Sequence, residues 1–120
     1  SFQWTCSNIS MFYLVDTYEL CKIKFPNIRF LTENHVSNFP WLSVQNLPKQ
    51  IKDEIRDQIT RKLQFYFDMD PFYVNYMYEK DLWPEYGKTF INFLESLDKA
   101  RNTNWKKSLC GLAKKLNGLI

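Results

Sequence analysis

The sequence lacks the features of several protein classes. It has three glycines and five prolines in 120 residues, which excludes collagen-like and low-complexity chains. The glycines lie apart, at positions 87, 111 and 118, so no glycine-rich phosphate-binding loop is present. Charged residues interrupt every hydrophobic stretch, and no apolar run approaches the roughly 18 residues of a membrane-spanning helix. We therefore expect no membrane span.

Cysteine and histidine are also scarce. Cys6, Cys21 and Cys110 are an odd number with wide spacing, and His35 is the single histidine. No Cys-x-x-Cys pair exists, so the sequence predicts neither a disulfide framework nor a zinc site. This cysteine usage is typical of a reducing compartment, and we expect a cytoplasmic protein with no metal ion bound by this chain.

The excess of positive over negative charge in the whole chain is small. The net charge is +3, from 16 Lys and Arg against 13 Asp and Glu, which argues against a nucleic-acid partner. The basic residues are unevenly placed, because six of them and no acidic residue follow Asp98. Such a Lys-rich end is either a solvated helix face or a surface for anions or membranes.

Aromatic residues are abundant instead. Ten Phe, seven Tyr and four Trp supply the apolar area for one small ordered domain. The sequence starts at Ser1 without an initiator Met and without a signal-peptide core. We expect the chain to be part of a longer protein.

The first third of the chain predicts a βαβ unit. Alternating apolar and polar residues over 2–7 indicate a strand, and apolar residues at mixed spacing over 9–24 indicate a helix with Ser7, Asn8 or Ser10 as its cap. A second strand is predicted over 28–32. The two strands of such a unit lie parallel, and they need neighbours to cover their edges and faces.

The remainder predicts mainly helices. One is predicted to begin at a cap formed by Asn46 or Leu47, and to direct a four-residue apolar repeat inward and charged residues toward water. Its inward residues are Ile51, Ile55, Ile59 and Leu63, and its water-facing residues are Lys49, Lys52, Asp53, Arg56 and Asp57. The stretch 68–86 is a loop or a short helix, a further helix opens at Trp83, and the last begins near Trp105.

Polar side chains follow both predicted strands. Ser7 and Asn8 come directly after the first, and Glu33, Asn34 and His35 come after the second. Ligands of parallel α/β sheets bind at the carboxyl ends of strands. Glu33 and His35 therefore suit an acid and a base in a small standalone enzyme, while the alternative is a polar loop that caps neighbouring backbone. No complete catalytic motif is present, and the catalytic residues are unknown.

Three stretches carry a family resemblance. The run FPWLSVQNLP over 39–48, followed by IKDEI, resembles a part of radical S-adenosylmethionine (SAM) proteins of the twitch-domain type, where an aromatic residue and Leu-Ser-Ile-Gln-x-Leu-Pro open a helix. The stretch TCSNISMFYL over 5–14 is similar to their late barrel strand with its helix, and FLESLDKARNTNW over 93–105 is similar to their closing helix. Together they cover most of the chain in the expected order.

The resemblance implies a partial (β/α) barrel in which a 4Fe–4S cluster holds SAM. Reductive cleavage of SAM then gives a 5′-deoxyadenosyl radical that abstracts hydrogen from a substrate. The defining Cys-x-x-x-Cys-x-x-Cys is absent here, and Cys6, Cys21 and Cys110 do not replace it. The resemblance therefore implies the C-terminal part of such an enzyme, with the missing N-terminal barrel segment as its partner and no cofactor bound by this chain alone.

On that barrel the polar strand ends face the cavity for SAM and substrate. By position, Thr5, Ser7, Asn8 and Asn34 are candidates for binding the cofactor. Glu33 and His35 are candidates for binding an unidentified substrate, a peptide or a small molecule. Cys110, a single thiol, is a weak candidate for a ligand of an auxiliary cluster.

These patterns predict an α/β fold. Residues 1–48 form the late βαβ part of a radical SAM-like barrel, with two parallel strands, and residues 49–120 form a mainly helical C-terminal extension. The alternative from another class is a non-catalytic, mostly helical interaction module whose Lys-rich last helix contacts an acidic partner.

Overall fold

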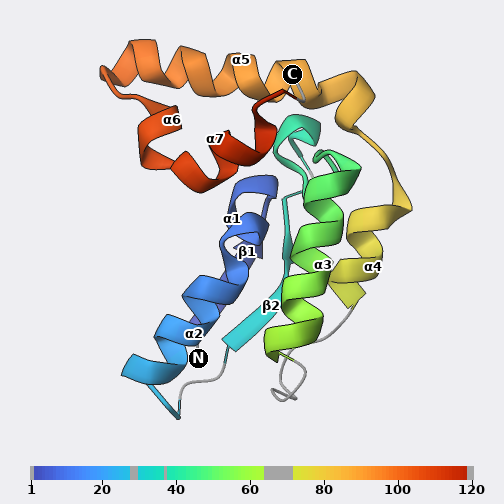
Figure 1. Cartoon of the computed structure of the whole chain (residues 1–120), viewed down its shortest axis with the longest axis vertical. Coiled ribbons are helices and arrows are strands. Elements are labelled where there is room, and N and C mark those ends of the chain that lie inside the picture. Colours follow the sequence, from blue (N-terminus) through green and yellow to red (C-terminus); the bar gives the residue numbers. More distant parts are fainter. Residues whose placement is uncertain (1, 28–29, 37, 64–71, 119–120) are drawn as a thin grey trace.

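A computed structural model describes residues 2–27, 30–36, 38–63 and 72–118 (Figure 1). Helix α5 lies across one end of the molecule, and α1 with α2 and α3 with α4 lie on either side of β2. In chain order the elements are β1 (Phe2–Cys6), α1 (Asn8–Phe12), α2 (Leu14–Lys24), β2 (Phe30–His35), the 3-10 helix η1 (Pro40–Leu42), α3 (Lys49–Leu63), α4 (Phe72–Glu79), α5 (Trp83–Arg101), α6 (Trp105–Ser108) and α7 (Cys110–Leu116).

Strands β1 and β2 pair in parallel, and α1 with α2 forms the connection between them. Phe2 lies opposite Phe30, and Cys6 lies opposite His35. The pairing continues one residue further, since the Val36 N–H donates to the Cys6 carbonyl at 3.0 Å. Within the described ranges the sheet has these two strands and the rest of the chain is mainly helical, so the described residues form no barrel by themselves.

The second strand lies later in the sequence than predicted. It covers Phe30–His35 rather than 28–32, and residues 28 and 29 lie outside the described part. Glu33, Asn34 and His35 are therefore the last residues of β2 and not a loop after it. Parallel pairing uses backbone groups of every residue type, so a polar end does not stop the strand.

The helix predicted over 9–24 is two helices, α1 and α2, which meet at Tyr13. The predicted cap is confirmed, because Ser7 Oγ accepts from the Ser10 N–H at 3.2 Å and Ser10 Oγ accepts from the Ser7 N–H at 2.7 Å. At the break, the Tyr13 hydroxyl accepts from the Leu112 N–H at 3.3 Å. The break thus ties the first helices to α7, 99 residues away in sequence.

One hydrophobic core contains residues from both predicted ranges, 1–48 and 49–120. Apolar side chains from β1, α1, α2, the segment before α3 and all the later helices bury together. The buried residues of this core are Cys6, Met11, Leu14, Val15, Tyr18, Val44, Leu47, Ile51, Ile55, Met77, Phe90, Ile91, Leu94, Trp105, Leu112 and Leu116. The two ranges therefore share a single core.

In α3, Ile51 and Ile55 are buried and Ile59 packs against the core as predicted, whereas the side chain of Leu63 lies outside the described part of the chain. One of the charged residues of α3 is not in water. Lys52 is 3% exposed and its Nζ donates to the Lys80 carbonyl at 3.2 Å, so its predicted exposure is wrong. The carbonyls at the end of α4 attract a cation, and this offsets the loss of water around the ammonium. Burial lowers the pKa of Lys52, and Asp81 raises it in part. A second link holds α4 to α3, since the Tyr78 hydroxyl donates to Asp53 at 2.6 Å.

The C-terminal end folds around the carboxylate of Asp98. Its two oxygens accept from the Thr103 hydroxyl and the Trp105 N–H, both at 3.0 Å. Asn102 ends α5 with a left-handed φ of 52°, and the Asn104 side chain caps α6 by accepting from the Lys106 N–H at 3.1 Å. The last helix, predicted as one, is two short helices with a break at Leu109.

None of the described helices has both the length and the apolar character needed to cross a membrane.

Candidate functional site

The carboxyl ends of β1 and β2 lie side by side and form one edge of the ribbon. Thr5 lies opposite Asn34, and Cys6 lies opposite His35. The structure therefore brings the backbone of all the predicted site residues to this edge, namely Thr5, Ser7, Asn8, Glu33, Asn34 and His35. The side chains of Glu33 and Asn34 lie outside the described part of the chain, so their predicted roles stay predictions.

Ser7 and Thr5 differ in the hydrogen bonding of their side chains. The Ser7 hydroxyl is occupied at the start of α1, where it accepts from the Ser10 N–H. The Thr5 side chain is exposed, and the Thr5 carbonyl accepts from the Ser10 hydroxyl at 2.7 Å, whereas no hydrogen bond of the Thr5 hydroxyl is found among the described residues. Thr5 thus presents an open hydroxyl at the strand end, whereas Ser7 mainly holds α1 in place.

Asn8 is completely buried, and protein atoms occupy its amide. Its Nδ2 donates to the Trp41 carbonyl at 2.9 Å and to the Asn46 carbonyl at 3.4 Å, and its Oδ1 accepts from the Ile9 N–H at 2.9 Å. These bonds join α1 to the chain that precedes α3. Asn8 would have to give up these hydrogen bonds to contact a cofactor directly, so its role in cofactor binding stays a prediction. Its structural role is to hold α1 against the segment before α3.

The segment 43–48, which we call the connector, is buried although half of it is polar. Gln45 Nε2 donates to the Tyr76 carbonyl of α4 at 2.9 Å, and the Gln45 carbonyl accepts from the Leu82 N–H at 3.4 Å. Ser43 Oγ accepts from the Gln45 N–H at 3.1 Å. Buried polar groups persist when they are hydrogen-bonded, and here the bonds hold α4 and the start of α5 against the connector.

Asn46 joins the connector to η1 and α5 through hydrogen bonds. Its Nδ2 donates to the Trp41 carbonyl at 2.9 Å and to the Tyr86 carbonyl of α5 at 3.1 Å. The prediction that Asn46 caps α3 is wrong, because its side chain points to these carbonyls and the first turn of α3 closes on the Pro48 carbonyl. Asn8 and Asn46 thus converge on one carbonyl, that of Trp41.

Two buried polar atoms near this carbonyl have no hydrogen-bond partner among the described residues. They are Asn46 Oδ1 and Trp41 Nε1, an acceptor and a donor. A buried polar atom without a hydrogen-bond partner is uncommon in native proteins. The sequence predicted Asn46 as one of two alternative caps of α3, and Trp41 only as part of the stretch over 39–48. The feature of the sequence that points to this region is the pair of amide side chains, Gln45 and Asn46, within a mainly apolar stretch.

His35 sits at the end of β2 against an aromatic ring from α4. Its imidazole and the Tyr76 ring have centroids 4.5 Å apart at an interplanar angle of 39°. Burial lowers the pKa of His35, so the neutral imidazole predominates near neutral pH. Tyr76 was missed as a site residue because it falls in the stretch that the sequence left open between loop and helix.

The connector also lines a cavity of about 270 Å³ that has both polar and apolar residues in its walls. Its other wall is the turn between α4 and α5, so the cavity lies where the connector, Lys80 and the first turn of α5 meet. It is lined by Pro40, Ser43, Gln45, Lys80, Leu82, Glu85 and Tyr86. A positively charged side chain, a negatively charged side chain and several hydrogen-bonding groups therefore line the same cavity.

The cysteines do not form a cluster-binding set. Cys6, Cys21 and Cys110 belong to β1, α2 and α7, and only Cys6 is buried. Burial raises the pKa of the Cys6 thiol to about 12, so the thiolate that ligates iron is disfavoured there. In the part of the chain that the structure describes, no three His, Cys, Asp or Glu side chains are grouped to hold a metal ion. These residues do not fit a 4Fe–4S cluster.

Comparisons of this chain with protein-family models, with curated proteins and with solved structures found no match.

Proposed function

We propose that this chain is the C-terminal part of a radical SAM enzyme of the twitch-domain type. In this proposal it forms one side of the cavity in which SAM and a substrate react. The observation that carries it is the parallel β1–α1–α2–β2 unit, which brings Thr5, Ser7 and His35 to one edge of the sheet. Ligands of parallel α/β sheets bind at that edge.

The contacts among the family-like stretches support the proposal. Asn8, from the stretch over 5–14, donates to the carbonyls of Trp41 and Asn46, from the stretch over 39–48. Asp98, from the stretch over 93–105, organises the turn from α5 into α6. The stretches over 5–14 and 39–48 are thus joined to each other beside the end of β1, and the stretch over 93–105 shapes the turn from α5 into α6.

The residues of this chain have limited roles in the proposal. His35 presents a neutral imidazole to the substrate with its ring fixed against Tyr76, and Asn34 and Thr5 contact SAM. The iron–sulfur cluster, which would supply the electron for SAM cleavage, does not fit the cysteines here. We assign its ligands to an N-terminal segment, which would pair with the outer edge of β1 and extend the sheet toward a barrel.

The coding DNA upstream of Ser1 provides the first test. We expect an in-frame Cys-x-x-x-Cys-x-x-Cys within about 100–200 residues, the length of one domain. A start codon close to Ser1 without that motif contradicts the proposal.

The longer protein then allows a chemical test. After anaerobic reconstitution with iron and sulfide, it should release 5′-deoxyadenosine from SAM under reduction. Asn34→Ala should weaken SAM binding, and His35→Ala should lower the turnover of substrate. The exposed residue Lys107, in α6, supplies a matched control, since Lys107→Ala should leave both quantities unchanged. An intact reconstituted cluster without SAM cleavage contradicts the proposed activity.

A second candidate function is an interaction module that binds an acidic partner. The lysines of α6 and α7 favour it, because Lys106, Lys107 and Lys114 are exposed and have no ion pair within the described chain. Lys115 contacts Glu54 at 3.2 Å. Titration with a poly-glutamate peptide tests this function. The peptide should bind the chain and lose affinity with Lys106→Glu and Lys114→Glu together, and the absence of binding removes the candidate.

A further inference from the structure

The cavity of about 270 Å³ between the connector and the turn from α4 to α5 has no part in the function proposed above. None of the residues that line it belongs to the strand ends. Its lining combines a positive side chain, Lys80, and a negative one, Glu85, with two buried polar side chains, Ser43 and Gln45. These groups together define the chemistry of a ligand that the cavity can hold.

The two buried polar side chains offer an acceptor and a donor. Gln45 is 5% exposed and its Nε2 donates to the Tyr76 carbonyl, but no hydrogen bond to its Oε1 is found among the described residues. Ser43 is 4% exposed, and its Oγ accepts from the Gln45 N–H, while no acceptor for its hydroxyl hydrogen is found in the described ranges. A buried amide oxygen is stabilised by a donor such as an ammonium group, and a hydroxyl donates well to a carboxylate.

Lys80 and Glu85 place opposite charges at the same cavity. Both side chains are exposed, and neither has an ion pair in the described part of the molecule. Lys80 directly follows α4 and Glu85 lies in the first turn of α5, so the two charges come from both sides of the turn. Because each charge attracts its opposite, the pair is complementary to a ligand that carries a carboxylate and an ammonium group.

The size of the cavity and its apolar residues limit the ligand further. A volume of about 270 Å³ corresponds to roughly nine water molecules at about 30 Å³ each. This is less than the volume of a typical pocket for a drug-sized molecule. Pro40, Leu82 and Tyr86 form an apolar wall beside the charged groups. The ligand is therefore small, carries both charges and has an apolar part.

We propose that this cavity binds a free α-amino acid with an apolar side chain. The carboxylate of the amino acid contacts Lys80 and the Ser43 hydroxyl. Its ammonium group contacts Glu85 and Gln45 Oε1, and its side chain packs on the apolar wall. This binding site is separate from the strand ends, so it does not depend on the proposed radical SAM activity.

Leucine is the test ligand, and two analogues each lack one of its charged groups. Isoamylamine lacks the carboxylate, and isocaproate lacks the ammonium group. In an NMR titration of the 120-residue chain, leucine should shift the backbone amide signals of Ser43, Gln45 and Leu82. The dissociation constant should be about 1 mM or lower, as expected for a small ligand. Each analogue should bind at least about fivefold more weakly, because it loses one charge contact.

Two variants assign each charge of the ligand to one residue. Lys80→Gln should weaken leucine binding about fivefold without weakening the binding of isoamylamine, which has no carboxylate. Glu85→Gln should weaken leucine binding to a similar extent without weakening the binding of isocaproate, which has no ammonium group. Both residues are exposed, so the variants should fold like the unmodified chain.

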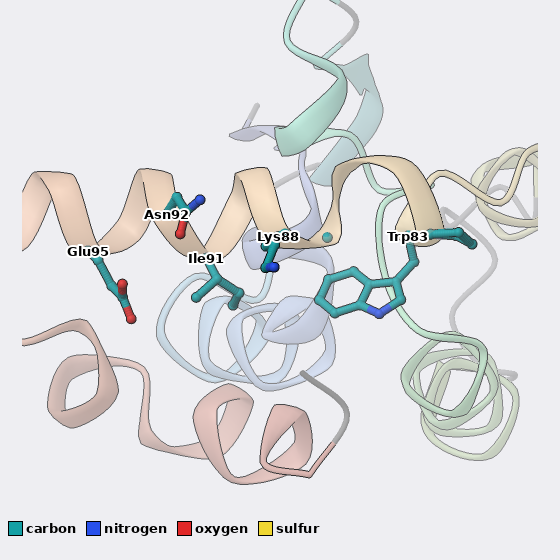
Figure 2. Close-up of a pocket in the computed structure, with 7 residues that line it drawn as sticks. Trp83, Lys88, Ile91, Asn92 and Glu95 are labelled. Carbon is teal, nitrogen blue, oxygen red and sulfur yellow. The ribbon is translucent and has the colours of Figure 1, made fainter.

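Lys88 and Glu95 supply matched controls. They are exposed, and they line a separate groove of about 500 Å³ along α5 (Figure 2). The groove and the cavity share no lining residue among the described ones. Lys88→Gln and Glu95→Gln remove the same charges and should leave the affinity for leucine unchanged.

Several outcomes overturn the proposal. One is the absence of leucine binding up to about 10 mM, and another is equal binding of leucine and both analogues. Signal shifts centred on Lys88 and Glu95 place the ligand in the groove along α5 instead. SAM carries the same two charged groups on a larger body, so tighter binding of SAM that is lost with Lys80→Gln also contradicts a site for a free amino acid. None of these results depends on the upstream cysteine motif, so the cavity and the proposed function are tested separately.

Discussion

The connector and the α6–α7 end of this molecule use polar residues in opposite ways. In the connector, Gln45 and Asn46 are buried and their amides donate to the carbonyls of other segments. In α6 and α7, Lys106, Lys107 and Lys114 extend into water without an ion pair in the described chain. A buried polar group is costly to leave unpaired, whereas an exposed charge contributes little to stability. Stability is therefore expected to depend on the amides, and interactions with other molecules on the lysines.

The largest expected effect is at Asn46. Asn46→Ala removes the donor for the Trp41 and Tyr86 carbonyls and leaves a small cavity at a completely buried position. We expect a loss of about 2–4 kcal/mol in the free energy of unfolding, measured by urea denaturation. Asn75 is exposed on α4, and Asn75→Ala should change that free energy by less than about 0.5 kcal/mol. Equal losses at the two positions would contradict the structural role of the connector.

Cys6 is buried and Cys110 is exposed, so the two thiols extend the comparison of buried and exposed groups to the pH dependence of stability. Burial raises the pKa of its thiol from 9.0 to about 12, so the folded chain holds the thiol proton more tightly than the unfolded chain does. The resulting stability is fully present below about pH 9 and is lost as the pH rises toward 12. At pH 11 the loss attributable to Cys6 should be about 2–3 kcal/mol.

The measurement is urea denaturation between pH 8 and pH 11 on Cys6→Ala and the unmodified chain. Cys6→Ala should be less stable at pH 8, because it leaves a cavity, and should lose less stability as the pH rises. Cys110 is exposed on α7, and Cys110→Ala should keep the steep alkaline loss of the unmodified chain. If Cys6→Ala loses stability as steeply, the thiol is not the group responsible.

The next effect is at the turn between α5 and α6. Asp98→Ala removes the acceptors for the Thr103 hydroxyl and the Trp105 N–H, so the start of α6 loses its link to α5. We expect a loss of about 1–2 kcal/mol in the free energy of unfolding, as for other capping carboxylates. Glu95 is exposed on the same helix, and Glu95→Ala supplies the control. A similar loss in both variants would contradict the role of Asp98.

Local patterns in the sequence predicted the elements that depend on neighbouring residues. Alternation indicated β1, the four-residue apolar repeat indicated α3, and Ser7 was one of the three residues predicted as the cap of the first helix. Each of these features is decided within a few residues of chain. The parallel pairing of the two strands followed from their short helical connection.

Features that depend on distant partners were not predicted. Tyr13 divides the first helix, and its hydroxyl accepts from the N–H of a residue 99 positions away. Lys52 is buried because a carbonyl from α4 lies within reach, 28 residues further on. Tyr76 contacts His35 from a stretch without clear periodicity. The candidate site follows the same division, since the polar residues near the strand ends were predicted and the buried hydrogen bonds of the connector were not.

The smallest effect is expected at the lysines. Lys107→Ala removes an exposed charge that has no ion pair among the described residues, so the free energy of unfolding should change by less than about 0.5 kcal/mol. Lys115→Ala is the informative neighbour, because it removes the exposed contact with Glu54 and should cost no more than about 1 kcal/mol. Urea denaturation at low and at high salt distinguishes the two, since only the Lys115 contribution should decrease with salt. A large loss from Lys107→Ala would mean that the basic end stabilises the fold, and the contrast with the connector would fail.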